Sequence, residues 1–500
     1  MEFPIAFSFS EQRPKQGGMR VTKHETVFIA LKEAILEGAL PYGTRLPSSR
    51  ELAAMHGLSR GTVNLAYEQL AAEGYVQGRK GSGTFVAFSG AGHNSKEASK
   101  LLGGSRIVLS QWGKQLESLP KPIRTGGSKW RSAQYGISFT TGQPELKSFP
   151  ASEWARLLYA QVRALNRHPD SEKFEAAGHY PLRAAIAKHL GRTRAFHAHP
   201  EQIVIVNGSM QAIAILVQLL INAGDSVVLE NPSYKGFYAA VLSVGGSCIT
   251  APVDEQGLQV SDWPARLAFV TPGRQFPTGA VLAMDRRQRL LQWADDQEAL
   301  IVEDDYDTEF RHRGKPLEPL KALDRRGRVI FLGTFSKTML PYMRIGYVVL
   351  PDGLTEAFIR AKQLYEPSPA SLLEQRALAE MMKSGLYEKH LRRMRRVYSR
   401  KYGLLAEGIR RGLGDWLQLV ESDAGLHVFA WWKGSREQLA EFQDRCHQEG
   451  VSWSDGGVYF IGEGRPALCL GFSHLEDEQI EEGLERMKLA AGQLRQDKPL

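Results

Sequence analysis

The chain is 500 residues long, with 43% hydrophobic and 24% charged residues and a formal net charge of +8; one core rarely organises such a length, so two or more domains are expected. No apolar run is long enough to span a bilayer, and no basic flank precedes an apolar N-terminal core, which argues against a membrane or secreted protein. Three widely spaced cysteines argue against a disulfide framework or a metal cluster and indicate a cytoplasmic protein. The excess of Lys and Arg over Asp and Glu permits a nucleic-acid partner.

The first predicted domain covers residues 24–88 and begins with three short helices. Apolar residues at helical spacing predict the first of them. A capping box of Ser48 and Glu51 opens a second helix, which stops at Gly57. Ser59 caps the third helix. The buried stripe of this third helix is expected to contain Val63, Ala66, Tyr67 and Leu70.

The second and third helices, joined by a tight turn, predict a helix-turn-helix. Arg60 and Thr62 then lie near the helix end that enters the major groove. Strands at 75–77 and 84–86 flank a basic, glycine-rich hairpin tip whose backbone could lie against phosphate. A helical protein-interaction module is the alternative. Charge does not decide between them, because residues 1–90 hold ten Lys and Arg against eight Asp and Glu.

Three runs in this region are similar to the winged helix-turn-helix of the GntR superfamily. They are Leu46-Pro47-Ser48-Ser49-Arg50-Glu51-Leu52-Ala53, Leu58-Ser59-Arg60-Gly61-Thr62-Val63 and Gly81-Ser82-Gly83-Thr84-Phe85-Val86. The resemblance extends roughly from Thr26 to Ala87 and implies that the partner is a double-stranded DNA operator. The candidate DNA contacts are Ser48, Arg50, Arg60, Thr62, Arg79, Lys80 and Gly81.

Residues 89–135 are predicted to form a linker between two domains. The stretch 88–94 is rich in glycine, serine and alanine, and further glycines and prolines follow it. Most of this stretch lacks helical periodicity. The exception is a possible short helix near Ile107 to Leu116.

Residues 136–500 alternate apolar strands with helical segments, which predicts an α/β domain with a largely parallel sheet covered on both faces. The strands are expected at 203–206, 226–229, 267–270, 299–303, 329–332 and 346–350. Ligands of such sheets lie at the carboxyl ends of the strands, so the residues that follow each strand are candidates for a site. Shorter strands at 428–432 and 467–472 predict a small C-terminal α+β subdomain within about 355–500.

Three of these strand ends carry residues suited to a phosphorylated ring. Gly208 and Ser209 begin a helix whose free N–H groups would favour a phosphate, although a tight strand-to-helix turn is the alternative. Tyr234 could stack on a flat ring, or it could be an ordinary packing residue. The acidic run 303–307 could supply a carboxylate that keeps a pyridine nitrogen protonated; a solvated loop or a metal site is the alternative.

A lysine lies in the turn Gly333-Thr334-Phe335-Ser336-Lys337-Thr338-Met339-Leu340-Pro341, and Arg344 follows it. A lysine amine condenses with an aldehyde to form an imine, while hydroxyls and a guanidinium bind a nearby phosphate. Pyridoxal 5′-phosphate is a cofactor that has both groups. A surface lysine in a turn is the alternative interpretation.

The order and spacing of these segments resemble the fold-type I aminotransferases, and more narrowly the MocR (GabR-like) regulators, which join a GntR-type winged helix to that fold. The runs that carry the resemblance include Gly178-His179-Tyr180-Pro181-Leu182-Arg183, Glu230-Asn231-Pro232-Ser233-Tyr234, Glu303-Asp304-Asp305-Tyr306-Asp307 and Arg344-Ile345-Gly346-Tyr347. The resemblance implies Lys337 as the aldimine lysine, Asp304 at the pyridine nitrogen and Tyr306 at the ring oxygen. It also implies that Tyr234 stacks on the ring and that the phosphate is held by Gly208, Ser209, Met210, Thr334, Ser336 and Arg344. Family members build this site across a dimer interface, which implies a homodimer.

The sequence departs from the family where a substrate carboxylate would bind. Arg274 replaces the histidine of the usual His-Gln pair, and Cys469 stands where aminotransferases commonly carry a carboxylate-binding arginine. No arginine occurs from 451 to 461 that could bind the carboxylate instead. Arg465 or Arg274 could take the place of the missing carboxylate-binding arginine. Two kinds of effector therefore remain as alternatives: the cofactor itself, and an amine or amino acid. A basic run at 390–397 is best interpreted as a solvated helix face, with additional DNA contact as the alternative.

These features favour a DNA-binding transcription regulator that senses pyridoxal phosphate or an amino compound through an aldimine at Lys337. An active aminotransferase with a secondary DNA-binding module is the main alternative, and residual transaminase activity fits both. A repressor with a vestigial site is the third possibility.

Overall fold

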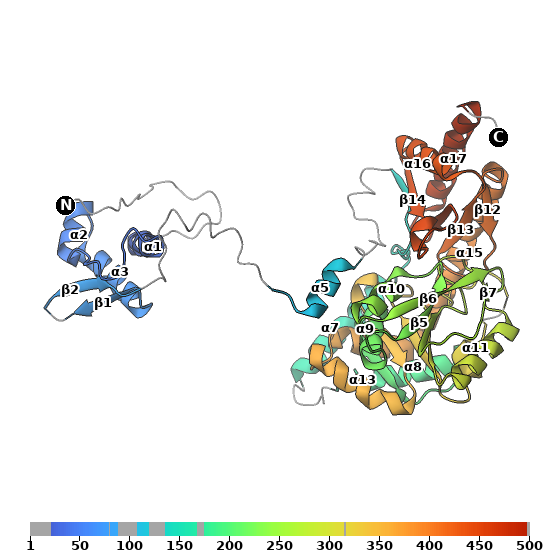
Figure 1. The fold of residues 1–500 in the computed structure, drawn as a ribbon, viewed down its shortest axis with the longest axis horizontal. Helices are drawn as coiled ribbons and strands as arrows, with labels where there is room; N and C mark the ends of the chain where they lie inside the picture. Colours follow the sequence, from blue (N-terminus) through green and yellow to red (C-terminus); the bar gives the residue numbers. More distant parts are fainter. Residues whose placement is uncertain are drawn as a thin grey trace. The chain divides into compact units, whose positions relative to one another are not determined.

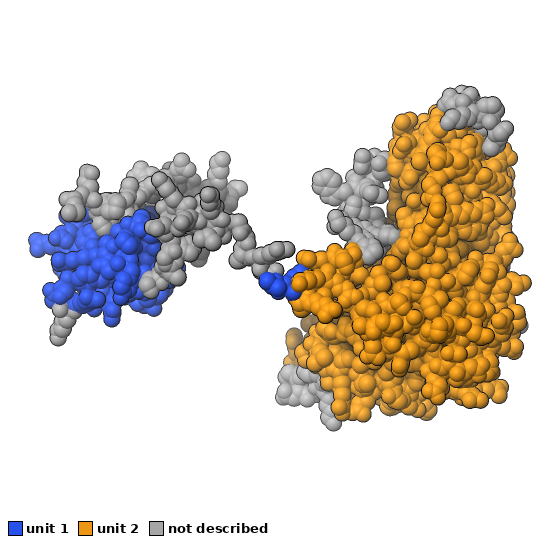
Figure 2. All heavy atoms as spheres, in the orientation of Figure 1, with its two compact units in different colours: residues 1–109 blue, residues 110–500 orange. Residues whose placement is uncertain are grey.

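The computed structural model describes residues 22–79, 81–88, 108–119, 136–167, 175–314 and 317–497. The chain forms two compact units, residues 1–109 and residues 110–500, shown in blue and orange in Figure 2. Each unit buries a hydrophobic core of its own.

The described part of the first unit is a winged helix-turn-helix, as predicted. Its helices are α1 (Lys23–Leu36), α2 (Ser49–His56) and α3 (Arg60–Ala72), and its hairpin strands are β1 (Val76–Arg79) and β2 (Gly83–Val86) (Figure 1). The predicted caps are confirmed: Ser48 and Glu51 form the capping box of α2, and Ser59 accepts a hydrogen bond from the backbone N–H of Thr62. Gly57 ends α2 with a φ of 63°, a left-handed conformation that glycine adopts without steric cost.

The core of this unit lies between α1 and α3. All four residues of the predicted stripe are buried, and they form one cluster with Val27 and Leu31 of α1. The segment before α2 adds a short pairing to the hairpin: the N–H of Leu46 donates to the Thr84 carbonyl at 2.9 Å, and Arg45 forms a β-bridge with Phe85. The sequence does not predict this pairing, which connects the hairpin to the segment that leads into α2.

The second unit is built on an eight-stranded sheet with the order β4-β11-β10-β9-β8-β5-β6-β7. The strands are β4 (Ile203–Val206), β5 (Ser226–Asn231), β6 (Ser247–Asp254), β7 (Gly257–Leu258), β8 (Leu267–Val270), β9 (Leu300–Asp305), β10 (Val329–Thr334) and β11 (Gly346–Val349). Strand β11 is antiparallel to β10 and β4, β7 is antiparallel to β6, and the other neighbours are parallel. All six predicted strands are confirmed. Strands β6 and β7 were missed, because β6 is partly exposed and polar and β7 has two residues.

Helices cover both faces of this sheet. Phe237 of α10 (Lys235–Ser243) and Phe358 of α13 (Asp352–Tyr365) pack with Val302 on one face, together with α9 (Ser209–Leu220). Trp293 of α11 (Met284–Asp296) packs with Ile301 on the other face, as expected for successive residues of a strand. The remaining helices around this sheet are α7 (Ala151–Arg167), α8 (Tyr180–Thr193), α12 (Leu320–Leu323) and α14 (Leu372–Lys383). The α/β fold class is confirmed.

A second sheet of five strands, in the order β12-β13-β15-β14-β3, forms the small subdomain. Its strands are β3 (Ile137–Phe139), β12 (Leu417–Val420), β13 (His427–Trp432), β14 (Val451–Asp455) and β15 (Ala467–Gly471), and its helices are α15 (Leu386–Gly412), α16 (Arg436–Gln448) and α17 (Asp477–Asp497). Strand β3 pairs in parallel with β14, with Ile137 opposite Val451. The subdomain therefore takes one strand from the start of the unit, outside the predicted range 355–500. A three-residue strand gives no periodic signal from which this could be inferred.

Most of the predicted linker lies outside the described residues. Within 108–119, helix α5 (Gln111–Ser118) is close to the short helix expected there, and the Gln115 side chain donates to the Leu242 carbonyl of α10 at 2.6 Å. This part of the predicted linker therefore belongs to the second unit, where it packs against α10. In the part of the chain that the structure describes, none of the helices has both the length and the apolar character needed to cross a membrane.

Candidate functional site

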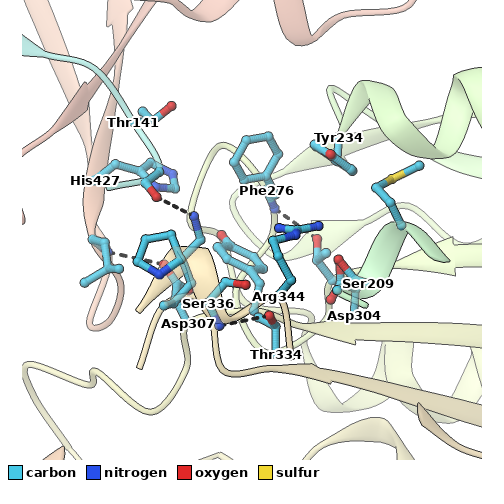
Figure 3. Close-up of a pocket in the computed structure, with 18 residues that line it drawn as sticks. Thr141, Ser209, Tyr234, Phe276, Asp304, Asp307, Thr334, Ser336, Arg344 and His427 are labelled. Atoms are coloured by element: carbon cyan, nitrogen blue, oxygen red, sulfur yellow. Dashed lines mark hydrogen bonds between the residues drawn. The ribbon is translucent and has the colours of Figure 1, made fainter. Parts of the chain in front are cut away.

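One cavity of about 280 Å³ collects all ten cofactor-site residues that the sequence singled out (Figure 3). They are Gly208, Ser209, Met210, Tyr234, Asp304, Tyr306, Thr334, Ser336, Lys337 and Arg344. Most of them come just after the carboxyl ends of strands in the large sheet, where open α/β sheets bind ligands. The structure brings the ten residues together, and the role of each one stays a prediction.

One end of this cavity offers hydrogen-bond donors to an anion. Helix α9 begins at Ser209, and the preceding Gly208 has no side chain to cap it, so its first N–H groups are available to a ligand. Arg344 lies beside this helix start, with a backbone φ of 53° that strains a residue other than glycine. The hydroxyls of Thr334 and Ser336 line the same cavity, and the N–H of Ser336 donates to Thr334 Oγ1 at 3.1 Å. This set of donors suits a phosphate group.

The close approach of Gly208 to Arg344 gives a prediction for ligand affinity. We expect Gly208→Ala to weaken pyridoxal phosphate binding by about 10- to 100-fold, since the added Cβ would lie 2.5 Å from Arg344 Nη2 and displace the guanidinium. Gly224→Ala is the matched control, because Gly224 also has a positive φ of 91° but an added Cβ there meets nothing within 4 Å. Fluorescence titration of both variants measures the difference. Equal losses in the two variants would assign the effect to backbone strain and contradict the phosphate site.

Lys337 extends from the turn after β10 into the cavity. Its Nζ donates to the Gly142 carbonyl at 2.8 Å, which fixes the position of the amine. Burial lowers the pKa of the Lys337 amine, and the nearby Asp307 and Asp304 oppose this shift. A lowered pKa increases the neutral fraction of the amine, which is the form that attacks a carbonyl.

Asp304 presents a carboxylate oxygen without a donor. Among the described residues, no hydrogen-bond partner reaches its buried Oδ1. Burial, reinforced by Asp305 and Asp307, raises the pKa of Asp304 to about 7. A buried acceptor without a donor is costly, so this position favours a ligand that donates a hydrogen bond to it.

Two neighbouring carboxylates of the acidic run have partners of their own, although Asp307 Oδ1, like Asp304 Oδ1, has none among the described residues. Glu303 accepts the N–H groups of Leu320 and Lys321, each at 2.8 Å, and Asp307 pairs with Arg274 at 3.2 Å. Within the described ranges, no group of histidine, cysteine, aspartate and glutamate side chains is arranged to hold a metal ion. The run therefore contributes the carboxylates of Asp304 and Asp307 to the cavity wall, while Glu303 and Asp307 also fix the surrounding loops.

Aromatic rings form another wall of the cavity. The rings of Tyr234 and Tyr306 are both edge-on to Phe276, at centroid distances of 6.1 and 5.7 Å. Burial raises the pKa of Tyr306 well above its usual value, so its hydroxyl stays protonated. Arg274 Nη1 donates to this hydroxyl at 2.6 Å, which leaves the Tyr306 proton free to be donated to a ligand.

Besides Leu426, sequence reasoning missed three lining residues that come from the small sheet and the segment before α7. They are Thr141, Gly142 and His427. His427 Nε2 lies 3.0 Å from the Pro277 carbonyl, and burial together with Arg274 holds the pKa of His427 well below its usual value. The imidazole is therefore neutral. None of the three belongs to a recognisable motif, and the sheet pairing that brings them to the cavity is not visible in the sequence.

Neither arginine that could have replaced the carboxylate ligand lines the cavity. Arg274 is buried, and besides Tyr306 it donates from Nε to the Ala424 carbonyl at 2.7 Å. Arg465 is exposed and lies over the Trp431 ring at 4.9 Å. Cys469 is fully buried in β15. Neither arginine therefore lines this cavity, whose arginine among the described residues is Arg344 at the predicted phosphate end.

The predicted DNA contacts of the helix-turn-helix lie at the starts of its two helices. Arg50 and Arg60 are exposed in the first turns of α2 and α3. Thr62 Oγ1 lies 2.8 Å from Ser59 Oγ and so also supports the helix start. Ser48 uses its hydroxyl in the capping box, where it accepts from the N–H of Glu51 at 3.2 Å, so its first role is structural.

The predicted contacts of the hairpin lie at its tip. Arg79 is exposed, with its guanidinium over the Phe85 ring at 5.0 Å. Gly81 has a φ of 79°, a turn conformation that suits glycine. Lys80 lies outside the described residues.

Comparison with known proteins agrees with both halves of the chain. Residues 136–487 match the family described as aminotransferase class I and II, and residues 23–86 match the gntR family of bacterial regulatory proteins. The chain is 37% identical over 475 residues to the probable rhizopine catabolism regulatory protein MocR of Rhizobium meliloti, with 94% of each chain covered. It is 31% identical to the pyridoxine biosynthesis transcriptional regulator PdxR of Corynebacterium glutamicum, with 80% of this chain and 81% of the relative covered.

Among solved structures, the α-aminoadipate aminotransferase LysN of Thermus thermophilus is similar to the second unit. That structure contains N-(5′-phosphopyridoxyl)-L-leucine, and it is 29% identical with a TM-score of 0.65. The match covers 75% of this chain and 97% of the aminotransferase. The enzyme therefore matches part of this chain, whereas the Rhizobium regulator matches nearly all of it.

Proposed function

Because the chain belongs to the MocR-type family of transcriptional regulators, we propose that it binds a DNA operator through residues near 24–88 and senses pyridoxal 5′-phosphate or an amine in the cavity at Lys337. The observation that carries this proposal is the convergence of three groups in one cavity: a buried amine, an anion-binding helix start and an unpartnered carboxylate. These are the groups that the aldehyde, the phosphate and the protonated ring nitrogen of the cofactor require.

The residues present fit this cofactor. When bound, pyridoxal phosphate supplies an aldehyde that condenses with amines and a ring that withdraws electrons. Lys337 would hold it covalently, and Asp304 would accept a hydrogen bond from its ring nitrogen, which satisfies the unpartnered oxygen. Tyr234 would stack on the ring, and Tyr306 would donate to the ring oxygen. The phosphate would be held by Gly208, Ser209, Met210, Thr334, Ser336 and Arg344.

The DNA-binding unit would act in pairs. We infer a homodimer from the family, and a dimer presents two helix-turn-helix units to one operator, which raises the effective concentration of the second after the first has bound. Arg50, Arg60 and Thr62 would contact the DNA at the helix starts, and Arg79, Lys80 and Gly81 would approach phosphates from the hairpin. An effector changes this binding only if it favours one of two conformations of the protein.

An aminotransferase with a secondary DNA-binding module is less well supported. The family assignment rests on regulators that cover both parts of the chain, whereas the similar aminotransferase matches the second part. The cavity also lacks, within the described residues, a second arginine for a substrate carboxylate. Steady turnover of an amino donor with a 2-oxo acid would nevertheless restore the enzyme hypothesis.

The regulatory proposal is tested by operator affinity. An operator would be obtained by in vitro selection from random duplexes, and its Kd would be measured by fluorescence anisotropy for the wild type and Lys337→Ala, each with and without pyridoxal phosphate. We expect the cofactor to change the wild-type Kd by about 5-fold or more, a typical size for coupling between two sites. The change should be much smaller in Lys337→Ala. Equal affinities in all four measurements would instead indicate a vestigial site.

A further inference from the structure

A second cavity, of about 250 Å³, lies between the end of α8, the loop after β9 and the helix α15. Four arginines from these three elements line it: Arg192, Arg194, Arg311 and Arg395. We call it the arginine cavity. It is separate from the cofactor site, with which it shares no lining residue.

The lining of the arginine cavity is rich in guanidinium donors. The four guanidinium groups face a single lining carboxylate, that of Glu309. His189 also lines the cavity, but burial lowers its pKa to about 4, so it adds no charge near neutral pH. The carboxylates that pair with these arginines offset much of the charge, so an anion would be held here by the guanidinium donors that stay free.

Three of the four arginines pair with carboxylates, and Arg311 is one of them through Asp423. Arg194 is held by Asp305 at 2.8 Å and by Glu309 at 3.2 Å. Arg192 pairs with Glu388. These ion pairs fix the walls of the cavity. The donors of Arg395 and Arg311 remain to be considered.

Arg395 and Arg311 keep donors without an acceptor among the described residues. Arg395 donates from Nε to the backbone carbonyl of Glu309 at 2.6 Å, and among the described residues no carboxylate lies within 4.0 Å of its guanidinium. Burial lowers the pKa of Arg395; the charge of Glu309 opposes this shift, and that of Arg194 reinforces it. Arg311 pairs with Asp423 through Nη2 at 3.3 Å. Its buried Nε has no hydrogen-bond partner among the residues that the structure describes. Arg311 Nε is the buried donor of these two side chains; a buried donor left unpaired is costly, and an anion would satisfy it.

We propose that the arginine cavity binds a small ligand through a phosphate group. A tetrahedral phosphate can accept hydrogen bonds from guanidinium groups that approach from several directions, whereas a carboxylate is satisfied by a single fork. The cavity is recessed and has room for a phosphate with a small substituent, which favours a small molecule over the backbone of DNA. The basic run 390–397 accordingly divides: Arg392, Arg393 and Arg396 are exposed, while Arg395 is turned inward to this cavity.

The test uses inorganic phosphate as the probe and calorimetric titration of the full chain at constant ionic strength. Because phosphate would also enter the cofactor site, the measurement is made in an Arg344→Ala background, in which that site is weakened. We expect this variant to retain one phosphate site. Adding Arg395→Gln should raise its Kd by about 10- to 100-fold, the range for a lost charge-assisted hydrogen bond.

Arg396→Gln in the same background is the matched control, because it removes an equal charge from the exposed side of the same helix turn. Its Kd should change by less than about twofold. If Arg395→Gln does not fold, Arg192→Gln replaces it, since that side chain is 52% exposed, and the Kd should rise by about 3- to 10-fold.

Three results would overturn the proposal. These are no phosphate binding in Arg344→Ala, equal losses for Arg395→Gln and Arg396→Gln, and displacement of phosphate by non-specific duplex DNA with weaker duplex binding in Arg395→Gln. The last result would identify the cavity as a contact for the DNA backbone. None of these outcomes depends on whether pyridoxal phosphate binds at Lys337.

Discussion

Arg60→Ala is expected to abolish sequence-specific operator binding while leaving cofactor binding intact. Arg60 is exposed in the first turn of α3, the part of a helix-turn-helix that contacts base edges in the major groove. A bidentate arginine contact to a base contributes roughly 1–3 kcal/mol of discrimination, and a symmetric dimer would lose this contribution twice. Specific binding should therefore approach the non-specific level. The measurement is a competition of the selected operator against non-specific duplex.

Arg79→Ala is the control for this experiment, because Arg79 lies in the hairpin and is expected to contact phosphate. Its loss should weaken specific and non-specific binding alike and reduce the salt dependence by about one phosphate contact. Intact operator preference in Arg60→Ala would show that another element reads the bases. It would leave the cofactor half of the proposal untouched.

Arg344→Ala should weaken retention of pyridoxal phosphate by about 10- to 100-fold, since a charge-assisted contact to phosphate contributes about 1.5–3 kcal/mol. Arg344 is the arginine that lines the described cavity, and its strained backbone sets it beside the start of α9. Equilibrium dialysis against the free cofactor measures the change.

Arg344→Lys separates charge from geometry, because lysine keeps the positive charge and loses the planar fork. An intermediate affinity is expected for this variant. If both variants retain wild-type affinity, the phosphate lies elsewhere, and the donors at Gly208 and Ser209 would have to be reassigned as well. Together with Gly208→Ala, these variants test both Gly208 and Arg344, which lie against each other at the predicted phosphate end of the cavity.

The parts of the fold that could be predicted are those with strong local signals. The caps at Ser48 and Ser59 and the turn at Gly57 follow from short-range chemistry, and the six main strands are continuous apolar runs. The ten cofactor-site candidates follow mostly from strand ends and from the resemblance to a known family. The structure places them around one cavity.

The features that could not be predicted depend on contacts between distant segments. Strand β3 is recognised through its pairing with β14, more than three hundred residues away, and His427 reaches the cavity through the small sheet. Arg274 was considered as a ligand for a substrate carboxylate, but it is saturated by buried acceptors in the interior. The sequence places Arg395 on a solvated helix face, whereas the structure turns it towards the loop after β9. In each case the side chain's direction depends on tertiary packing and not on its neighbours in sequence.

The most direct test of the central claim, that the second unit holds pyridoxal phosphate at Lys337, is the visible absorption spectrum of the full-length protein after loading with cofactor and dialysis. Lys235→Ala is the control, since Lys235 is also partly buried with a pKa lowered by burial and follows Tyr234 of the same site. We predict a cofactor band in the wild type and Lys235→Ala, its loss in Lys337→Ala, and attachment of the cofactor to the Lys337 peptide after borohydride reduction. A wild type without the band, or an equal band in Lys337→Ala, would contradict the claim.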